Sequence, residues 1–224
     1  PTQANGAAAI TIGRRAISNG SMSIALGLDA NSQGLASLAV GTNALAAGDV
    51  ATALGTSSLA NGVGASALGA GSNAFGANST AISTRSLASG ANTMALGFNA
   101  SATQADGVAL GRGAASTGAN SYALGTLAQA KSTQAIAIGN GAVADSNNGG
   151  NNAGQAIAIG ANAYAHSQDS SATGGNTAIA IGRNSYAELS GVAIGYGTQA
   201  SQGGAVAIGY AANAKDSASG VAIG

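Results

Sequence analysis

A short phrase of large residue, alanine, large residue and glycine recurs along the whole chain, and it constrains the fold more than any other feature. We call the glycine that closes each phrase the anchor. Anchors follow one another in steps of fourteen residues from Gly13 to Gly139, and Ser83 takes the place of one glycine. The later anchors, at wider or slightly shifted steps, are Gly160, Gly182, Gly195, Gly209 and Gly224. The sequence therefore predicts fifteen copies of one repeating unit, and we call each copy a rung.

Each rung is expected to hold two short β-strands. The residues before the anchor alternate with a period of two, as in Ile24, Ala25 and Leu26, and this alternation predicts a strand. Three and five residues after the anchor come only Ala, Ser or Thr, as at Ala30 and Ser32. Because mostly polar residues flank these positions, the pattern predicts a second strand with one small face and one polar face. Glycines between the strands permit tight turns.

The length of the repeat narrows the architecture. Fourteen residues at about 3.3 Å each form a circuit of at most roughly 46 Å, which suits a flattened coil of two strands better than a wide prism. Successive rungs would pair as parallel strands about 4.8 Å apart. We therefore predict an all-β parallel β-roll, a solenoid that forms one domain over residues 1–224. Two polar, glycine-rich segments near 146–154 and 166–176 are predicted to be loops inserted into the roll.

The first strand of each rung is the predicted association face. We expect Ile24 and Leu26 to point into the coil against the small Ala30 and Ser32, since large against small fills a thin slot. Ala25 would then belong to an outward wall of alanine that needs a partner. The reverse orientation would make that need stronger. The residues predicted to form the core or the association face are Ile24, Ala25, Leu26, Ile136, Ala137, Ile138, Val192, Ala193, Ile194, Val206, Ala207 and Ile208.

A candidate ligand-facing stripe occupies the middle outward position of the second strand. Its residues are Ile17, Leu45, Leu59, Leu87, Val143, Tyr164 and Tyr186. Stacked rungs would align these side chains into an interrupted apolar stripe that could receive a long, repetitive host surface. Two other interpretations stay open: isolated exposed apolar residues are normal on protein surfaces, or the stripe packs on a neighbouring subunit.

Composition argues against several classes of function. Charged residues make up 6% of the chain and the net charge is zero, so we expect no nucleic-acid partner. There is no cysteine, and the single histidine, His166, is expected to be a solvated loop residue rather than a metal ligand. No apolar run approaches the roughly 20 residues of a membrane span. We therefore predict no enzyme activity, no catalytic residues, no cofactor, no metal and no membrane contact by this fragment.

The motif resembles that of a known family. Two phrases, Gly191–Val192–Ala193–Ile194–Gly195 and Ala205–Val206–Ala207–Ile208–Gly209, are similar to the repeat of the YadA-like head of trimeric autotransporter adhesins, and the resemblance covers nearly the entire chain. It implies a left-handed parallel β-roll that forms a homotrimer about one axis on the surface of a Gram-negative bacterium. In that family the head stands on a coiled-coil stalk above an outer-membrane anchor, so we expect this chain to be a head fragment.

Adhesion is the leading functional hypothesis. The head of a trimeric rod would bind host extracellular matrix or cell-surface molecules, because weak contacts repeated threefold give strong attachment. The alternative is a structural spacer or a self-association (autoaggregation) module without its own host ligand. A third class, an ice-binding solenoid, would require a regular ladder of threonine, and here the threonines are scattered.

Overall fold

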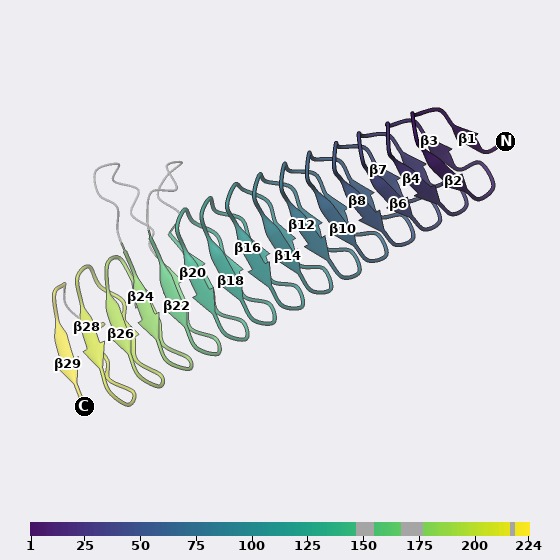
Figure 1. Ribbon diagram of the computed structural model, residues 1–224. Helices are drawn as coiled ribbons and strands as arrows, with labels where there is room; N and C mark the ends of the chain where they lie inside the picture. Colours follow the sequence, from purple (N-terminus) through teal and green to yellow (C-terminus); the bar gives the residue numbers. More distant parts are fainter. Residues whose placement is uncertain (147–154, 167–176, 216–217) are drawn as a thin grey trace. The chain divides into compact units, whose positions relative to one another are not determined.

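The computed structural model describes residues 1–146, 155–166, 177–215 and 218–224, and these residues form an all-β parallel solenoid (Figure 1). Each turn of the solenoid places one strand in each of two parallel sheets. We call the sheet whose strands lead into the anchor residues the anchor sheet, and the other the opposite sheet. The chain divides into two compact units, Pro1–Asp106 and Gly107–Gly224, and each is described by itself. A single domain over 1–224 stays a prediction.

In the first unit the odd-numbered strands form the opposite sheet and the even-numbered strands form the anchor sheet, each in chain order. The anchor-sheet strands are β2 (Ile10–Ile12), β4 (Ile24–Leu26), β6 (Leu38–Val40), β8 (Thr52–Leu54), β10 (Ser66–Leu68), β12 (Thr80–Ile82) and β14 (Met94–Leu96). The opposite-sheet strands are β1 (Gln3–Ala4), β3 (Ile17–Ser18), β5 (Asn31–Ser32), β7 (Leu45–Ala46), β9 (Leu59–Ala60), β11 (Asn73–Ala74), β13 (Leu87–Ala88) and β15 (Ser101–Ala102).

The second unit repeats this arrangement, and its last strand, β29, pairs with β28 in the anchor sheet. The anchor-sheet strands are β16 (Val108–Leu110), β18 (Tyr122–Leu124), β20 (Ile136–Ile138), β22 (Ile157–Ile159), β24 (Ile179–Ile181), β26 (Val192–Ile194), β28 (Val206–Ile208) and β29 (Val221–Ile223). The opposite-sheet strands are β17 (Ala115–Ser116), β19 (Gln129–Ala130), β21 (Val143–Asp145), β23 (Tyr164–His166), β25 (Tyr186–Glu188) and β27 (Gln199–Ala200).

Neighbouring strands pair so that each residue lies beside its counterpart in the next repeat. In β4 and β6, for example, Ala25 pairs with Ala39. The register survives the longer steps, since Ile136 of β20 pairs with Ile157 of β22 although they are 21 residues apart in the chain. The predicted insertions 146–154 and 166–176 therefore begin where opposite-sheet strands end. Apart from Ser146 and His166, their residues lie outside the described part of the chain.

The core consists of alanine and serine rather than of large aliphatic residues. Ala25 is fully buried, as are Ala30 and Ser32 on the facing sheet, whereas Ile24 and Leu26 point outward and are half-buried. The prediction that Ile24 and Leu26 fill the coil is therefore wrong. The physical reason is the small number of residues in each turn of the solenoid. So short a turn brings the two sheets so close that only small side chains fit between them.

The same orientation holds in the other predicted motifs. The alanine at the centre of each strand is fully buried, and the large residues on either side of it face outward. Among those outward residues, Ile194 and Ile208 are exposed. The buried alanines are Ala137, Ala193 and Ala207. The motif residues thus divide into a core set and a surface set.

Several serine hydroxyls in the core are paired inside it, whereas the buried hydroxyl of Ser79 has no hydrogen-bond partner among the described residues. Ser23 donates a hydrogen bond to the carbonyl oxygen of Gly20 at 2.6 Å, and its Oγ lies 2.7 Å from the Oγ of Ser18. Because Ser23 has only one hydroxyl proton, Ser18 must be the donor in the second bond. This pairing matters because a buried hydroxyl without a partner costs about 1–3 kcal/mol.

Turn geometry and close stacking both favour glycine at the corners of a rung. The anchor Gly125 has a φ of 133°, a conformation that L side chains rarely adopt. At the other corner, Gly118 has no positive φ, but a Cβ there would lie 1.9 Å from the carbonyl oxygen of Ser132 in the next rung. The first glycine therefore serves the turn and also the stacking, because a Cβ on Gly125 would lie 2.6 Å from the carbonyl oxygen of Gly139. The second glycine permits close stacking of the rungs.

Candidate functional site

The outward face of the anchor sheet carries two largely apolar columns, formed by the residues three before and one before each anchor. In the first unit Thr52, Ser66 and Thr80 interrupt the former column, while the latter is apolar throughout. We call this surface the anchor-sheet face. Its side chains are half-buried or exposed in both units, to as much as 77% at Ile223. The large residues of this face that are exposed are Ile10, Ile12, Leu54, Met94 and Leu96 in the first unit, and Tyr122, Ile194, Ile208, Val221 and Ile223 in the second. Apolar surface that is contiguous over many rungs marks an interface.

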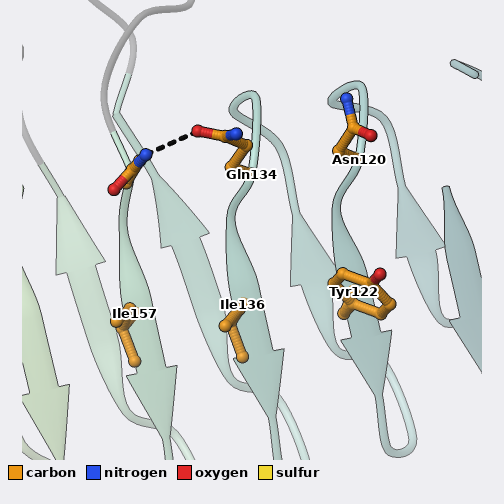
Figure 2. Close-up of a pocket in the computed structure, with 6 residues that line it drawn as sticks. Asn120, Tyr122, Gln134, Ile136 and Ile157 are labelled. Carbon is orange, nitrogen blue, oxygen red and sulfur yellow. Dashed lines mark hydrogen bonds between the residues drawn. The ribbon is translucent and has the colours of Figure 1, made fainter. Parts of the chain in front are cut away.

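A shallow groove of about 370 Å³ lies on the anchor-sheet face of the second unit (Figure 2). One wall is an apolar column and the other is a column of amide side chains, in which Gln155 donates a hydrogen bond to Gln134. The lining residues are Asn120, Tyr122, Gln134, Ile136, Gln155 and Ile157. Sequence reasoning missed this groove. The recurrence of an amide residue five positions before each of three successive anchors was the signal that could have found it.

The predicted stripe lies on the outward face of the opposite sheet. In the first unit its members share one register column, because Leu45 pairs with Leu59 and Asn31 pairs with both Ile17 and Leu45. All of its members are half-buried: Ile17, Leu45, Leu59 and Leu87. The polar residues Asn31 and Asn73 interrupt the column. The alignment is thus as predicted, while ligand binding by these residues stays a prediction.

In the second unit the stripe is continuous over three rungs. Val143 pairs with Tyr164, and Tyr164 pairs with Tyr186. The two tyrosine rings are stacked, with centroids 5.4 Å apart and planes 6° from parallel. Since rungs repeat about every 4.8 Å, the register places equal side chains at the stacking distance of aromatic rings.

The two tyrosines of the stripe are held in the neutral form. The Tyr186 hydroxyl donates a hydrogen bond to the Glu188 carboxylate. Burial is the largest cause that raises the pKa of Tyr186, followed by this hydrogen bond and the negative charge of Glu188. Burial also raises the pKa of Tyr164, and the charges of Asp145 and Glu188 add to the effect. This end of the stripe is therefore an uncharged aromatic surface at neutral pH.

A column of ionisable residues runs beside the tyrosines. The Lys131 ammonium lies 3.3 Å from the Asp145 carboxylate, and Asp145, His166 and Glu188 occupy successive places in the same register. The expectation that His166 is a solvated loop residue is wrong, because it ends strand β23 and is half-buried. Its ring lies 5.4 Å from that of Tyr164, and its buried Nδ1 has no hydrogen-bond partner among the described residues.

Within the residues that the structure describes, no group of three or more His, Cys, Asp or Glu side chains is placed to hold a metal ion. The same residues include no helix long and apolar enough to cross a membrane. Both faces are repetitive, because similar apolar side chains return at many successive rungs of each unit.

A solenoid of short parallel rungs with repeated outward apolar columns defines the class of parallel β-solenoid proteins. A family model described as the YadA head domain repeat (2 copies) matches more than half of the chain, and the chain belongs to this family. The matched residues are 32–58, 60–82, 88–114, 116–142, 152–177 and 189–212. No curated protein matches the chain. Membership indicates a surface-exposed function of the trimeric autotransporter adhesin type, and the family is in general non-enzymatic.

Proposed function

We propose that the chain forms the left-handed, homotrimeric head of an adhesin anchored in the outer membrane of a bacterium. The observation that supports this most directly is the anchor-sheet face, whose large apolar residues are turned outward in both units. Three copies that meet about one axis along this face would remove these columns from water. The orientation of the alanines supports the same conclusion, because the large residues contribute little to the core of the single chain.

The size of the anchor-sheet face suits a stable assembly. Burying the remaining exposed part of one half-exposed aliphatic side chain contributes about 1 kcal/mol. The ten exposed residues named for this face would therefore contribute roughly 10 kcal/mol per chain. Association costs an estimated 4–15 kcal/mol per partner in lost freedom, so the contribution of the apolar columns is of the same order as this cost.

We assign ligand binding to the stripe on the opposite sheet. Host extracellular matrix or cell-surface molecules would contact this apolar column, which faces away from the anchor-sheet face of the same rungs. A trimer would present three copies of the stripe, and multivalent contact would raise the apparent affinity well above that of one site. Proteins of the host surface, rather than nucleic acid or lipid, suit a stripe of leucine and tyrosine on a chain with no net charge.

A pair of variants separates assembly from binding. Leu54→Asp with Leu96→Asp places charge on the anchor-sheet face and should convert the trimer to monomer in light scattering across a dilution series. Leu45→Ser with Leu59→Ser alters only the stripe and should keep the trimer mass while weakening attachment to immobilised matrix proteins and host cells. Asn61→Ala, which changes an exposed residue directly after β9, is the matched control.

Two results would contradict the proposal. Unaltered attachment of the stripe variant, with the trimer intact, would exclude the stripe as the binding surface. A folded monomer of the unaltered chain at all concentrations would refute the role of the anchor-sheet face. Failure of the stripe test alone would leave the assembly argument in place, because the two variants change different sheets.

The second candidate function is a structural spacer or self-association module. The polar residues Asn31 and Asn73, which interrupt the stripe in the first unit, favour it. This function requires no affinity for host ligands and produces clumping of cells that display the head, in proportion to the amount displayed. A sedimentation assay of displaying cells, with and without added soluble head, distinguishes it from host adhesion.

A further inference from the structure

A second pair of stacked tyrosines lies outside both candidate faces, at the corners that follow the anchors Gly195 and Gly209. The rings of Tyr196 and Tyr210 have centroids 5.3 Å apart and planes 7° from parallel. Both side chains are exposed, Tyr196 to 44% and Tyr210 to 76%. On its other side, the Tyr196 ring is covered by Arg183, whose Cζ lies 5.8 Å from the ring centroid. Each ring is therefore stacked on the other and is accessible to water.

The backbone holds these two residues together. The amide of Ala211 donates a hydrogen bond to the carbonyl oxygen of Tyr196 at 2.8 Å, and Gly197 donates to Arg183 at 3.0 Å. The two tyrosines thus start from hydrogen-bonded turns of successive rungs and cannot drift apart. Their side chains keep freedom to turn, because both are exposed. Such tethering gives a high effective concentration of one phenol beside the other.

We propose that Tyr196 and Tyr210 are a site of oxidative cross-linking, at which a haem peroxidase with hydrogen peroxide joins the two rings as dityrosine. The enzyme removes one electron and one proton from each phenol, and the peroxide takes up both electrons and both protons to give two molecules of water. The two phenoxyl radicals form one carbon–carbon bond between ring carbons next to the hydroxyls. The hydrogens on those carbons move to the oxygens, which restores two phenols.

The dityrosine bond would link one rung covalently to the next. It would link the turn after β26 to the turn after β28, and so close a covalent loop across a contact that the native chain holds with hydrogen bonds and ring stacking. Opening of these rungs would then require movement of both strands together. The inference does not depend on the trimer or on any host ligand, since both phenols belong to one chain.

The chain contains its own controls. Tyr164 and Tyr186 are stacked at nearly the same distance but are half-buried, so a protein-sized oxidant has less access to them. Tyr122 is exposed, but its register neighbours are Val108 and Ile136, so no tyrosine lies beside it in the next rung. Exposure and stacking occur together only at the pair of Tyr196 and Tyr210 among the described residues.

The test treats the assembled protein with horseradish peroxidase and hydrogen peroxide. Digestion with trypsin and a glutamate-specific protease cuts after Arg183, Glu188 and Lys215, so residues 189–215 form one fragment that contains only Tyr196 and Tyr210. We expect this fragment to lose two hydrogen atoms in mass and to show dityrosine fluorescence. The yield per chain should not change over a tenfold dilution, as intramolecular coupling requires.

Two variants locate the bond. Tyr210→Phe should abolish the mass loss in fragment 189–215, and Tyr164→Phe should leave it unchanged. Both replace a phenol with the same ring, so the fold is not at risk. Absence of the mass loss in the unaltered protein would overturn the proposal. Coupling that appears only as slower bands in denaturing gels, and that rises with protein concentration, would also overturn it, because it would join tyrosines of different chains.

Discussion

Replacement of Gly118 by alanine tests how closely the rungs stack. A Cβ on Gly118 would lie 1.9 Å from the carbonyl oxygen of Ser132, whereas real Cβ contacts shorter than 3.0 Å essentially never occur. The rungs would have to separate, and the amides of Thr117 and Gly118, which donate to Ala130 at 2.9 and 3.3 Å, would lose those bonds. Two lost hydrogen bonds cost about 1 kcal/mol each, and overpacking costs about 1–3 kcal/mol more. We expect a loss of about 3–5 kcal/mol in the free energy of unfolding.

Gly197→Ala is the matched control. Gly197 has a φ of 64°, and no atom lies within 4 Å of a Cβ built there. This variant should lose only about 1 kcal/mol, the cost of a left-handed conformation for alanine. Urea unfolding followed by circular dichroism, at one fixed chain concentration, measures both variants, because the stability of an oligomer depends on concentration. Losses that agree within about 0.5 kcal/mol would refute the explanation by close stacking.

Three further predictions concern the core, the anchor-sheet face and the stripe, in that order. Ala137→Leu should lower the free energy of unfolding by about 3 kcal/mol or more, because Ala137 is fully buried between the sheets, and a urea titration measures this. Ile136→Ala, at the outward neighbour, should lower it by only about 1 kcal/mol while the trimer dissociates at higher chain concentration in light scattering. Burial and Glu188 raise the pKa of Tyr186, so this residue contributes stability below the ordinary tyrosine pKa of 10.0 that is lost as pH rises above it. Tyr186→Phe should therefore reduce the fall in the urea midpoint between about pH 9 and pH 11, and an equal fall in both proteins would contradict this.

The strands and their parallel pairing could be predicted because their signals are local. The phrase that ends at Gly139, for example, predicted the strand now seen as β20, and the constant repeat predicted its pairing with β18. Alternation with a period of two and a glycine at the corner are both visible within one rung. The stripe of Val143, Tyr164 and Tyr186 was predictable for the same reason, since equal positions in successive rungs become neighbours once the rungs stack.

The direction of each strand face was not predictable from the alternation. In Ile24, Ala25 and Leu26 the pattern is consistent with either face inside, because reversing it exchanges core and surface without changing the period. The choice depends on the distance between the two sheets, which the closed circuit of the rung decides. Because that distance admits only alanine, serine and an occasional threonine, the large residues lie outside and create the anchor-sheet face.

By itself, the sequence determined the repeat, the two strands of each rung, their parallel register and the family to which the chain belongs. Only the tertiary structure decided which side chains are buried, where the amide groove lies, and that Tyr196 and Tyr210 meet ring to ring. Strand formation and register follow from spacing along the chain. Burial and side-chain contact, in contrast, depend on how closely two sheets and two rungs approach, and that distance is a property of the closed coil.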